Sequence, residues 1–250
     1  MIAGIAAWLG DAAHWAGDDG IPHRLFEHLW YSGLSLLVAA LIAIPVGLAI
    51  GHTGRGRFLV VTLAGAARAI PSLGLLFLMV LWLFPRLSGD AAFLVPNLVV
   101  LVVLAIPPVM AGAYAGVDGV DPAARDAARG MGMTGMDVLR KVELPCAMPL
   151  VFSGLRSAAL QVVATATIGA LAGLGGLGRY LIDGLKVSDY PQMASGALLV
   201  AVLALLVDGA FALVQRYAVS PGLTGRFRVG AEPGTKPVDV ELSVGQHRVG

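Results

Sequence analysis

Long apolar stretches separated by short polar segments dominate the chain. Three stretches contain no Asp, Glu, Lys or Arg, and they cover residues 31–50, 91–117 and 157–178. A fourth, 58–85, contains one charge, Arg68, and a fifth, 190–215, contains only Asp208. A helix needs about 20 apolar residues to cross a bilayer, whereas a barrel strand needs about ten of alternating polarity. These runs are long and lack alternation, so the pattern predicts five membrane-spanning helices.

The apolar pattern also sets the expected organisation of the chain. We place the five helices at about 29–50, 58–84, 91–114, 147–173 and 191–217, within a transmembrane domain of residues 29–218. Pro71 leaves two interpretations of 58–84 open, one long kinked helix or two short hairpinned spans, and the kinked helix is preferred. Residues 1–28 carry four acidic groups and no basic leader, which indicates an extracytoplasmic lead-in and not a cleaved signal peptide. Residues 219–250 are polar and Gly/Pro-punctuated, as is typical of a loosely ordered tail.

Basic residues are distributed unevenly between the two sides of the predicted helices. Eleven Lys and Arg residues lie on the side of segment 118–145 and the C-terminal tail, against four on the other side. Basic loops stay in the cytoplasm, so this bias places the N-terminus outside and the C-terminus in the cytoplasm. Composition agrees, because 57% of residues are hydrophobic and 13% are charged, against about 25% charged in soluble domains. A net charge of +1 suggests no nucleic-acid partner, and the single cysteine, Cys146, excludes an internal disulfide framework.

Segment 118–145 is the longest internal polar stretch. Asp121 is a favourable N-cap and Pro122 suits the first position of a helix, while glycines interrupt the helical pattern further on. We expect two short helices on the membrane surface, with a bend at Gly132 and an end at Pro145. The segment reads Asp126-Ala127-Ala128, three residues, Gly132, nine residues, then Val142-Glu143-Leu144-Pro145.

That spacing resembles the EAA loop of ABC-importer permeases. The family pattern is Glu-Ala-Ala, three residues, Gly, nine residues, then Ile, any residue and Leu-Pro, so Asp126 replaces Glu and Val142 replaces Ile. Further blocks resemble permeases of the quaternary-amine group, which import glycine betaine, choline or carnitine: Arg68–Leu76, Gly154–Ala158, Gly175–Gly178 and Leu206–Asp208. The block Ile70-Pro71-Ser72-Leu73 favours this group over the similar methionine-importer permeases, which remain the alternative.

The resemblance implies an all-α integral membrane fold, a five-span helical permease core whose cytoplasmic loop docks on a separate ATPase subunit. The implied contact residues are Asp126, Ala127, Ala128, Gly132, Met133, Val142, Leu144 and Pro145, with Met131 and Met136 as further apolar knobs. Other implied partners are a second permease subunit, an extracytoplasmic substrate-binding protein and membrane lipid. The sequence contains no Gly-x-x-x-x-Gly-Lys-Ser/Thr loop, so ATP and Mg are expected on the ATPase. We expect no catalytic residue, metal site or cofactor in this chain.

Several residues inside or beside the apolar runs are candidates for the translocation pathway. These are Arg68, Ser72, Arg156 and Asp208. A charged side chain in hydrocarbon is energetically costly, so Arg68 and Asp208 need polar partners. They pair with each other or line the translocation pathway, or each forms structural hydrogen bonds to a neighbouring helix. The structural role is the favoured interpretation. Arg156 directly precedes the charge-free stretch 157–178 on the predicted cytoplasmic side, where its side chain can reach the interface. By resemblance, Gly175, Gly176 and Gly178 form a turn near an outer gate; a plain loop between spans is the alternative.

Aromatic side chains are few in the predicted spans. An aromatic cage would suit a quaternary ammonium group, but no such cluster is evident. The resemblance assigns that cage to the separate binding protein. An intramembrane enzyme is a remote alternative, since it needs a nucleophile–base pair or a carboxylate–metal cluster within the spans.

Overall fold

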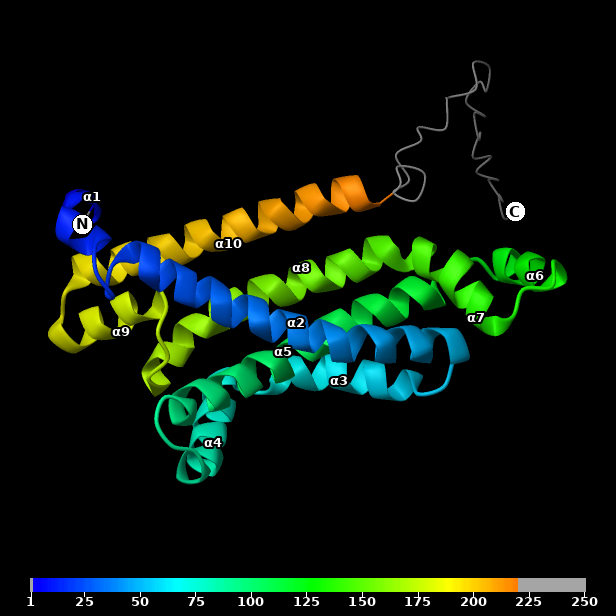
Figure 1. The fold of residues 1–250 in the computed structure, drawn as a ribbon, viewed down its shortest axis with the longest axis horizontal. Helices are drawn as coiled ribbons and strands as arrows, with labels where there is room; N and C mark the ends of the chain where they lie inside the picture. Colours follow the sequence, from blue (N-terminus) through cyan, green and yellow to red (C-terminus); the bar gives the residue numbers. More distant parts are fainter. Residues whose placement is uncertain (1, 220–250) are drawn as a thin grey trace, which may run out of the picture.

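The computed structural model of the chain describes residues 2–219, with the side chains at 59, 61, 64 and 66–68 left aside. All the regular secondary structure in this part of the chain is helical (Figure 1). Within it, four helices are long and apolar enough to cross a membrane. They are α2 (Ile21–Thr53), α5 (Ala91–Asp118), a continuous run Gly135–Ala172 that contains α8 (Leu144–Gly169), and α10 (Tyr190–Ala218).

Shorter elements join these helices and gather at the two ends of the bundle (Figure 1). One end, here called the α9 end, carries α1 (Ile2–Gly10), the 3₁₀ turn Ala12–Trp15 and α9 (Gly178–Val187). The other end, called the α6 end, carries α6 (Pro122–Gly130) and α7 (Gly135–Val138). The first long helix starts earlier than predicted, because α2 begins at Ile21 and not at residue 29. Gly20 caps that start in an extended conformation, and Pro22 suits the first turn.

Helices α2, α5 and α8 form the centre of the bundle, and small residues bring their backbones together. A Cβ atom at Gly112 of α5 would lie 2.6 Å from the Leu150 carbonyl oxygen, and one at Gly154 of α8 would lie 2.7 Å from the Pro108 carbonyl. Gly47 of α2 meets α5 in the same way, 2.7 Å from the Met110 carbonyl. In hydrocarbon, helices associate through such close packing and not through the hydrophobic effect. These glycines therefore fix the core of the bundle.

The segment 58–84 differs from the single kinked helix that we preferred. It forms two helices, α3 (Arg57–Ala69) and α4 (Ser72–Leu83), followed by a 3₁₀ turn, Phe84–Arg86. Pro71 is extended (φ −65°, ψ 112°) and opens α4, and a proline also drives the preceding residue, Ile70, out of the helical region. Helix α3 follows the bundle, whereas α4 turns away from it (Figure 1). With 13 and 12 residues, neither helix alone reaches the length of a span, so residues 2–219 contain four long apolar helices and not five.

Candidate functional site

The EAA-like segment forms a helix–bend–helix unit at the α6 end. The Asp121 carboxylate caps α6 by accepting a hydrogen bond from the Ala123 N–H (2.9 Å), and Pro122 is the first helical residue, as predicted. After α6 the chain bends at Gly132, whose φ of +85° favours glycine. Thr134 and Asp137 then form a capping box that starts α7. The predicted start, bend and second helix are therefore present.

The expected end at Pro145 is wrong. The chain stays helical from Gly135 to Ala172, so α7 leads directly into α8. A π turn, Leu139–Glu143, lies just before the proline, and the Leu144 N–H donates to the Leu139 carbonyl. Pro145 has no N–H to donate, and its ring would collide with the preceding turn of a regular α-helix. The wider π turn accommodates the ring, so the helical backbone continues without a break from α7 into the apolar helix α8.

A buried carboxylate, Glu143, ties this unit to the bundle. Its side chain is 1% exposed. One oxygen lies 2.9 Å from Nε of Arg125 on α6, and the other accepts a hydrogen bond from Nδ1 of His52 at the end of α2 (2.6 Å). Arg125 also donates to the Val117 carbonyl at the end of α5. Glu143 therefore connects α6 with the ends of the central helices.

The remaining residues of the motif divide between an outer and an inner face. Asp126, Ala127, Gly132 and Pro145 are exposed, whereas Met133, Val142 and Leu144 are half-buried. Met131 and Met136 are 72% and 54% exposed, which makes them the prominent apolar side chains of the unit. Ala128 is 2% exposed and packs against the chain itself. The outer face therefore carries small residues and two methionines beside exposed charges, which include Asp126 and its neighbour Arg129.

The charges inside the apolar helices form a pair between α8 and α10. Arg156 donates two hydrogen bonds to the Asp208 carboxylate, from Nε to Oδ1 (2.5 Å) and from Nη2 to Oδ2 (2.6 Å). Asp208 thus bonds to a neighbouring helix, and its partner is Arg156 of α8. Arg68 belongs to α3, and its side chain lies outside the described residues. Ser72 begins α4 and lines a small space with Asn97 and Thr165.

The glycine-rich loop at the α9 end packs tightly against α2. The Gly176 N–H donates to the Glu27 carboxylate (2.8 Å), with Gly176 at φ +85°. A Cβ atom at Gly175 would overlap the same carboxylate, and one at Gly178 would overlap the Thr167 backbone. The buried His28 donates from Nε2 to the Val163 carbonyl of α8 (3.0 Å). The loop is therefore a close junction between α2, α8 and α9.

Polar contacts extend this junction toward the N-terminus. The Tyr180 hydroxyl of α9 donates to the Asp19 carbonyl (2.7 Å). Burial raises the pKa of Tyr180 to about 12, so the hydroxyl keeps its proton and remains a donor. Arg24 of α2 bonds to the Asp19 carboxylate and to Glu27 (2.7 Å). The segment before α2 is thereby fixed to α9.

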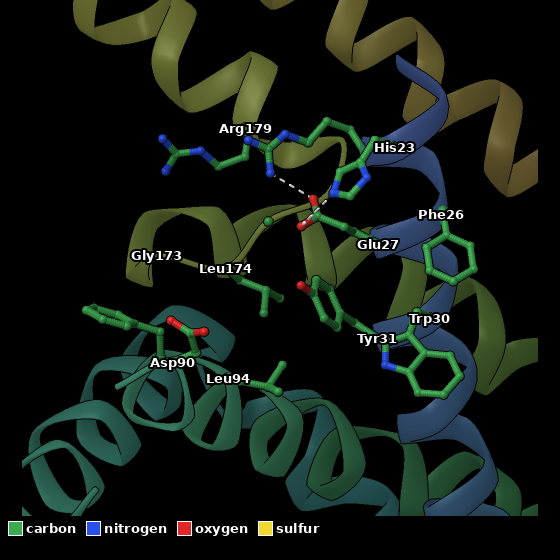
Figure 2. A pocket seen from close by; sticks show the side chains of 13 residues that line it. His23, Phe26, Glu27, Trp30, Tyr31, Asp90, Leu94, Gly173, Leu174 and Arg179 are labelled. Atoms are coloured by element: carbon green, nitrogen blue, oxygen red, sulfur yellow. Dashed lines mark hydrogen bonds and ion pairs between the residues drawn. The ribbon is translucent and has the colours of Figure 1, made fainter. Parts of the chain in front are cut away.

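Beside this junction lies a cleft of about 670 Å³ (Figure 2). Its walls come from α2, the start of α5 and the glycine-rich loop. The lining residues are His23, Arg24, Phe26, Glu27, Trp30, Tyr31, Asp90, Phe93, Leu94, Gly173, Leu174, Gly175 and Arg179. Four of them are aromatic, and the sequence pattern does not indicate that they line one cleft. These four residues belong to two helices far apart in the chain, and only tertiary packing places them around the same cleft.

Comparison with known proteins assigns the family. Residues 42–220 match the family described as binding-protein-dependent transport system inner membrane component. The chain belongs to this family. It is the permease of an ABC importer, a multi-helix component of the inner membrane and not an enzyme. The EAA-like segment, the Arg156–Asp208 pair and the glycine-rich loop all lie within the matched region.

Named relatives of the permease are transport subunits. It is 30% identical to the glycine betaine/carnitine/choline transport system permease protein OpuCB of Bacillus subtilis, over 81% of this chain and 90% of that one. It is 33% identical to the osmoprotectant import permease protein OsmW of Salmonella typhimurium, over 79% and 92%. The fold resembles an inward-facing structure of the MetNI methionine ABC transporter, with a TM-score of 0.65 and 23% identity over 78% of this chain and 94% of that one.

Two features of the permease were missed from the sequence. Glu143 occupies the any-residue position of the motif, and its partner His52 is 91 positions away, so no local pattern marks it as an anchor. The aromatic residues of the cleft were also missed, because they lie on two helices that the sequence shows separately. Among residues 2–219, no group of His, Cys, Asp and Glu side chains is placed to hold a metal ion.

Proposed function

We propose that this permease carries quaternary-amine osmoprotectants, such as glycine betaine or choline, into the cytoplasm by alternating access. The relatives named for glycine betaine, carnitine, choline and osmoprotectants support this substrate class. The observation that carries the transport mechanism is the exposed α6–α7 unit, which Glu143 anchors to the ends of the central helices. Movement imposed on that unit passes to α2 through the Glu143–His52 contact, to α5 through the hydrogen bond from Arg125 to the Val117 carbonyl, and to α8 through a continuous helix.

In this proposal the outer face of the α6–α7 unit docks into a cleft of the ATPase. Ala127 and Gly132 allow close approach, and Met131 and Met136 fill an imperfect groove because methionine side chains are flexible. Ala128, Val142 and Leu144 shape the unit from its inner side. ATP and Mg bind to the ATPase, and the permease supplies no cofactor site.

We further propose a membrane topology with five crossings. Helices α3 and α4 together make the fifth crossing, broken at Pro71. The basic side chains gathered toward the α6 end support a cytoplasmic position for that end, so the N-terminus and the α9 end lie outside. Two permease subunits, identical or paralogous, would pair around the pathway, and the binding protein would deliver substrate at the α9 end.

Reconstitution in lipid vesicles tests the substrate class. The permease is assembled with its ATPase and binding protein, and ATP hydrolysis is measured with glycine betaine, choline, carnitine or methionine added outside. We expect stimulation and uptake with the quaternary amines. Stimulation by methionine alone would refute the substrate class and support a methionine permease of the same family.

Cross-linking tests the docking face independently of substrate. Met131 is replaced by cysteine in a Cys146→Ser background, and a short bifunctional reagent is applied to native membranes. Capture of the ATPase is the expected result, and capture should fail for a cysteine placed at the buried Ala128. If the Met131→Cys variant captures no ATP-hydrolysing protein, the docking proposal is wrong.

A further inference from the structure

The N-terminal segment folds over the α9 end as a strap, defined here as residues 2–20. Its helix α1 lies beside the start of α10, and a Cβ atom at Gly4 would lie 3.2 Å from the Pro191 ring (Figure 1). The Trp8 side chain is 8% exposed and belongs to the same apolar cluster as Tyr180 of α9. The strap precedes the part of the chain that matches the family, so its role does not follow from the family.

Aromatic side chains fold the strap back on itself. The His14 ring stacks on Trp8 with the ring centroids 4.0 Å apart, and its Nδ1 donates to the Trp8 carbonyl (2.8 Å). Nε1 of Trp15 donates to the Leu9 carbonyl (2.7 Å). Both contacts join the 3₁₀ turn to the end of α1, so the strap is a folded unit that holds Trp8 in place.

Tyr180 of α9 contacts the strap at two points. Its hydroxyl donates to the Asp19 carbonyl (2.7 Å), and its ring meets Trp8 edge to face, with the centroids 5.1 Å apart. Asp19 is itself fixed, because its carboxylate accepts a hydrogen bond from Arg24 in the first turn of α2. Tyr180 therefore links α9 to α2 through the strap, in addition to the bond between Glu27 and the glycine-rich loop.

The covalent connection to α9 is less rigid than the connection at the α6 end, where α7 continues into α8. Between α8 and α9 the chain runs through Gly173 and Gly176, at φ +86° and +85°. Glycine backbone has the widest choice of conformations, so such a loop bends more easily than a helix. With ten residues, α9 is also too short to cross a membrane alone. Its position therefore depends on contacts with α10, the glycine-rich loop and the strap.

We propose that the strap makes α9 follow the movement of α2 during transport, with Tyr180 as the positioning residue on α9. In the alternating-access cycle the ATPase moves the α6 end of α2, and the other end of the same helix carries Arg24, which holds Asp19. The Asp19 carbonyl passes that movement to α9 through the Tyr180 hydroxyl. The inference rests on the proposed function, because it requires that the α9 end opens and closes to substrate.

Tyr180→Phe in the reconstituted transporter tests the link, because it removes only the hydroxyl. Hydrogen-exchange mass spectrometry should show α9 amides exchanging about threefold to tenfold faster, which corresponds to the loss of one hydrogen bond. The substrate transported for each ATP hydrolysed should fall by about twofold or more, since α9 then follows α2 in fewer cycles. Trp8→Ala should have the same two effects, whereas Trp8→Phe should stay near wild type, because phenylalanine keeps a ring beside Tyr180.

Tyr190→Phe is the matched control. Tyr190 at the start of α10 is 65% exposed, so the loss of its hydroxyl should leave both measurements at wild-type values. Faster exchange of α9 in Tyr180→Phe with a wild-type ratio of substrate to ATP would make the bond purely structural and overturn the positioning role. Wild-type exchange in both Tyr180→Phe and Trp8→Ala would overturn the strap itself. If the wild-type transporter moves methionine and no quaternary amine, the proposed function fails, and the same ratio measured with methionine still tests the strap.

Discussion

Glu143 should control whether the α6–α7 unit moves with the bundle. The Glu143→Gln substitution keeps the shape of the side chain but removes the charge that faces Arg125 and His52. Removing one partner of a buried ion pair costs about 3–5 kcal/mol. The Arg125 and His52 side chains are 19% and 21% exposed, so water compensates part of that loss. In the anchored state α6 is held to the bundle by Glu143, and in the detached state this contact is broken. We take about 2 kcal/mol as the loss of stability of the anchored state, which increases the population of the detached state by about 25-fold.

Hydrogen exchange measured by mass spectrometry reports that population directly. Amides of α6 in purified transporter should exchange about 25-fold faster in Glu143→Gln than in wild type, since exchange follows the population of the open state. Amides of α5 should be unchanged. Because a detached unit transmits less movement, more ATP should be hydrolysed for each substrate transported.

The exposed charge at Asp126 provides the comparison. Its side chain is 75% exposed and lies 3.6 Å from Arg129, a surface pair that contributes little to stability. Asp126→Asn should therefore leave exchange of α6 within a few-fold of wild type, whatever it does to the ATPase contact. If Glu143→Gln also leaves α6 exchange at the wild-type rate, the anchoring role of Glu143 is refuted.

Three further predictions concern the other sites. Asp208→Asn and Arg156→Gln should each lower the amount of permease recovered in the membrane, because each leaves one charge without its partner. The double variant Arg156→Asp with Asp208→Arg should restore that amount. Immunoblots of membrane fractions that show no loss in the single variants would contradict a structural role for the pair. Gly132→Asn should abolish transport while lowering the melting temperature only slightly, because no atom lies within 4 Å of the added Cβ and asparagine adopts positive φ more readily than other non-glycine residues. Normal uptake would count against close docking at this position. Gly175→Ala should lower the melting temperature by about 2–10 °C, because the added Cβ overlaps the Glu27 carboxylate. Gly33→Ala is the control and should leave the melting temperature unchanged, because no atom lies within 4 Å of its added Cβ. Equal melting temperatures in the two variants would mean that the loop is loosely packed.

The sequence by itself determined the class of protein and the position of its most specific motif. Runs of apolar residues too long for strands require helices in a membrane, because a spanning segment must satisfy its own backbone hydrogen bonds. The start of α6 at Asp121 and the bend at Gly132 were also predictable, since capping and positive φ depend on local residue chemistry. Fixed spacing between the blocks of the motif made the family visible.

Local rules failed where a neighbouring segment decided the outcome. Proline suggested a kink at Pro71 and an end at Pro145, but the chain breaks at the first and continues through a π turn at the second. Both positions obey the same steric rule, and the packing around each one selects between the available solutions. The pairing of Arg156 with Asp208 likewise depends on α8 and α10 lying side by side.

Only the tertiary structure assembled the anchor and the cleft. Glu143 reaches His52 across 91 positions, and the cleft joins side chains of α2, α5 and α9. Such contacts leave no periodic signal, because each helix shows only its own apolar face in the sequence. The close approach of the central helices at Gly47, Gly112 and Gly154 sets which ends meet, and that packing decides where the charged and aromatic side chains come together.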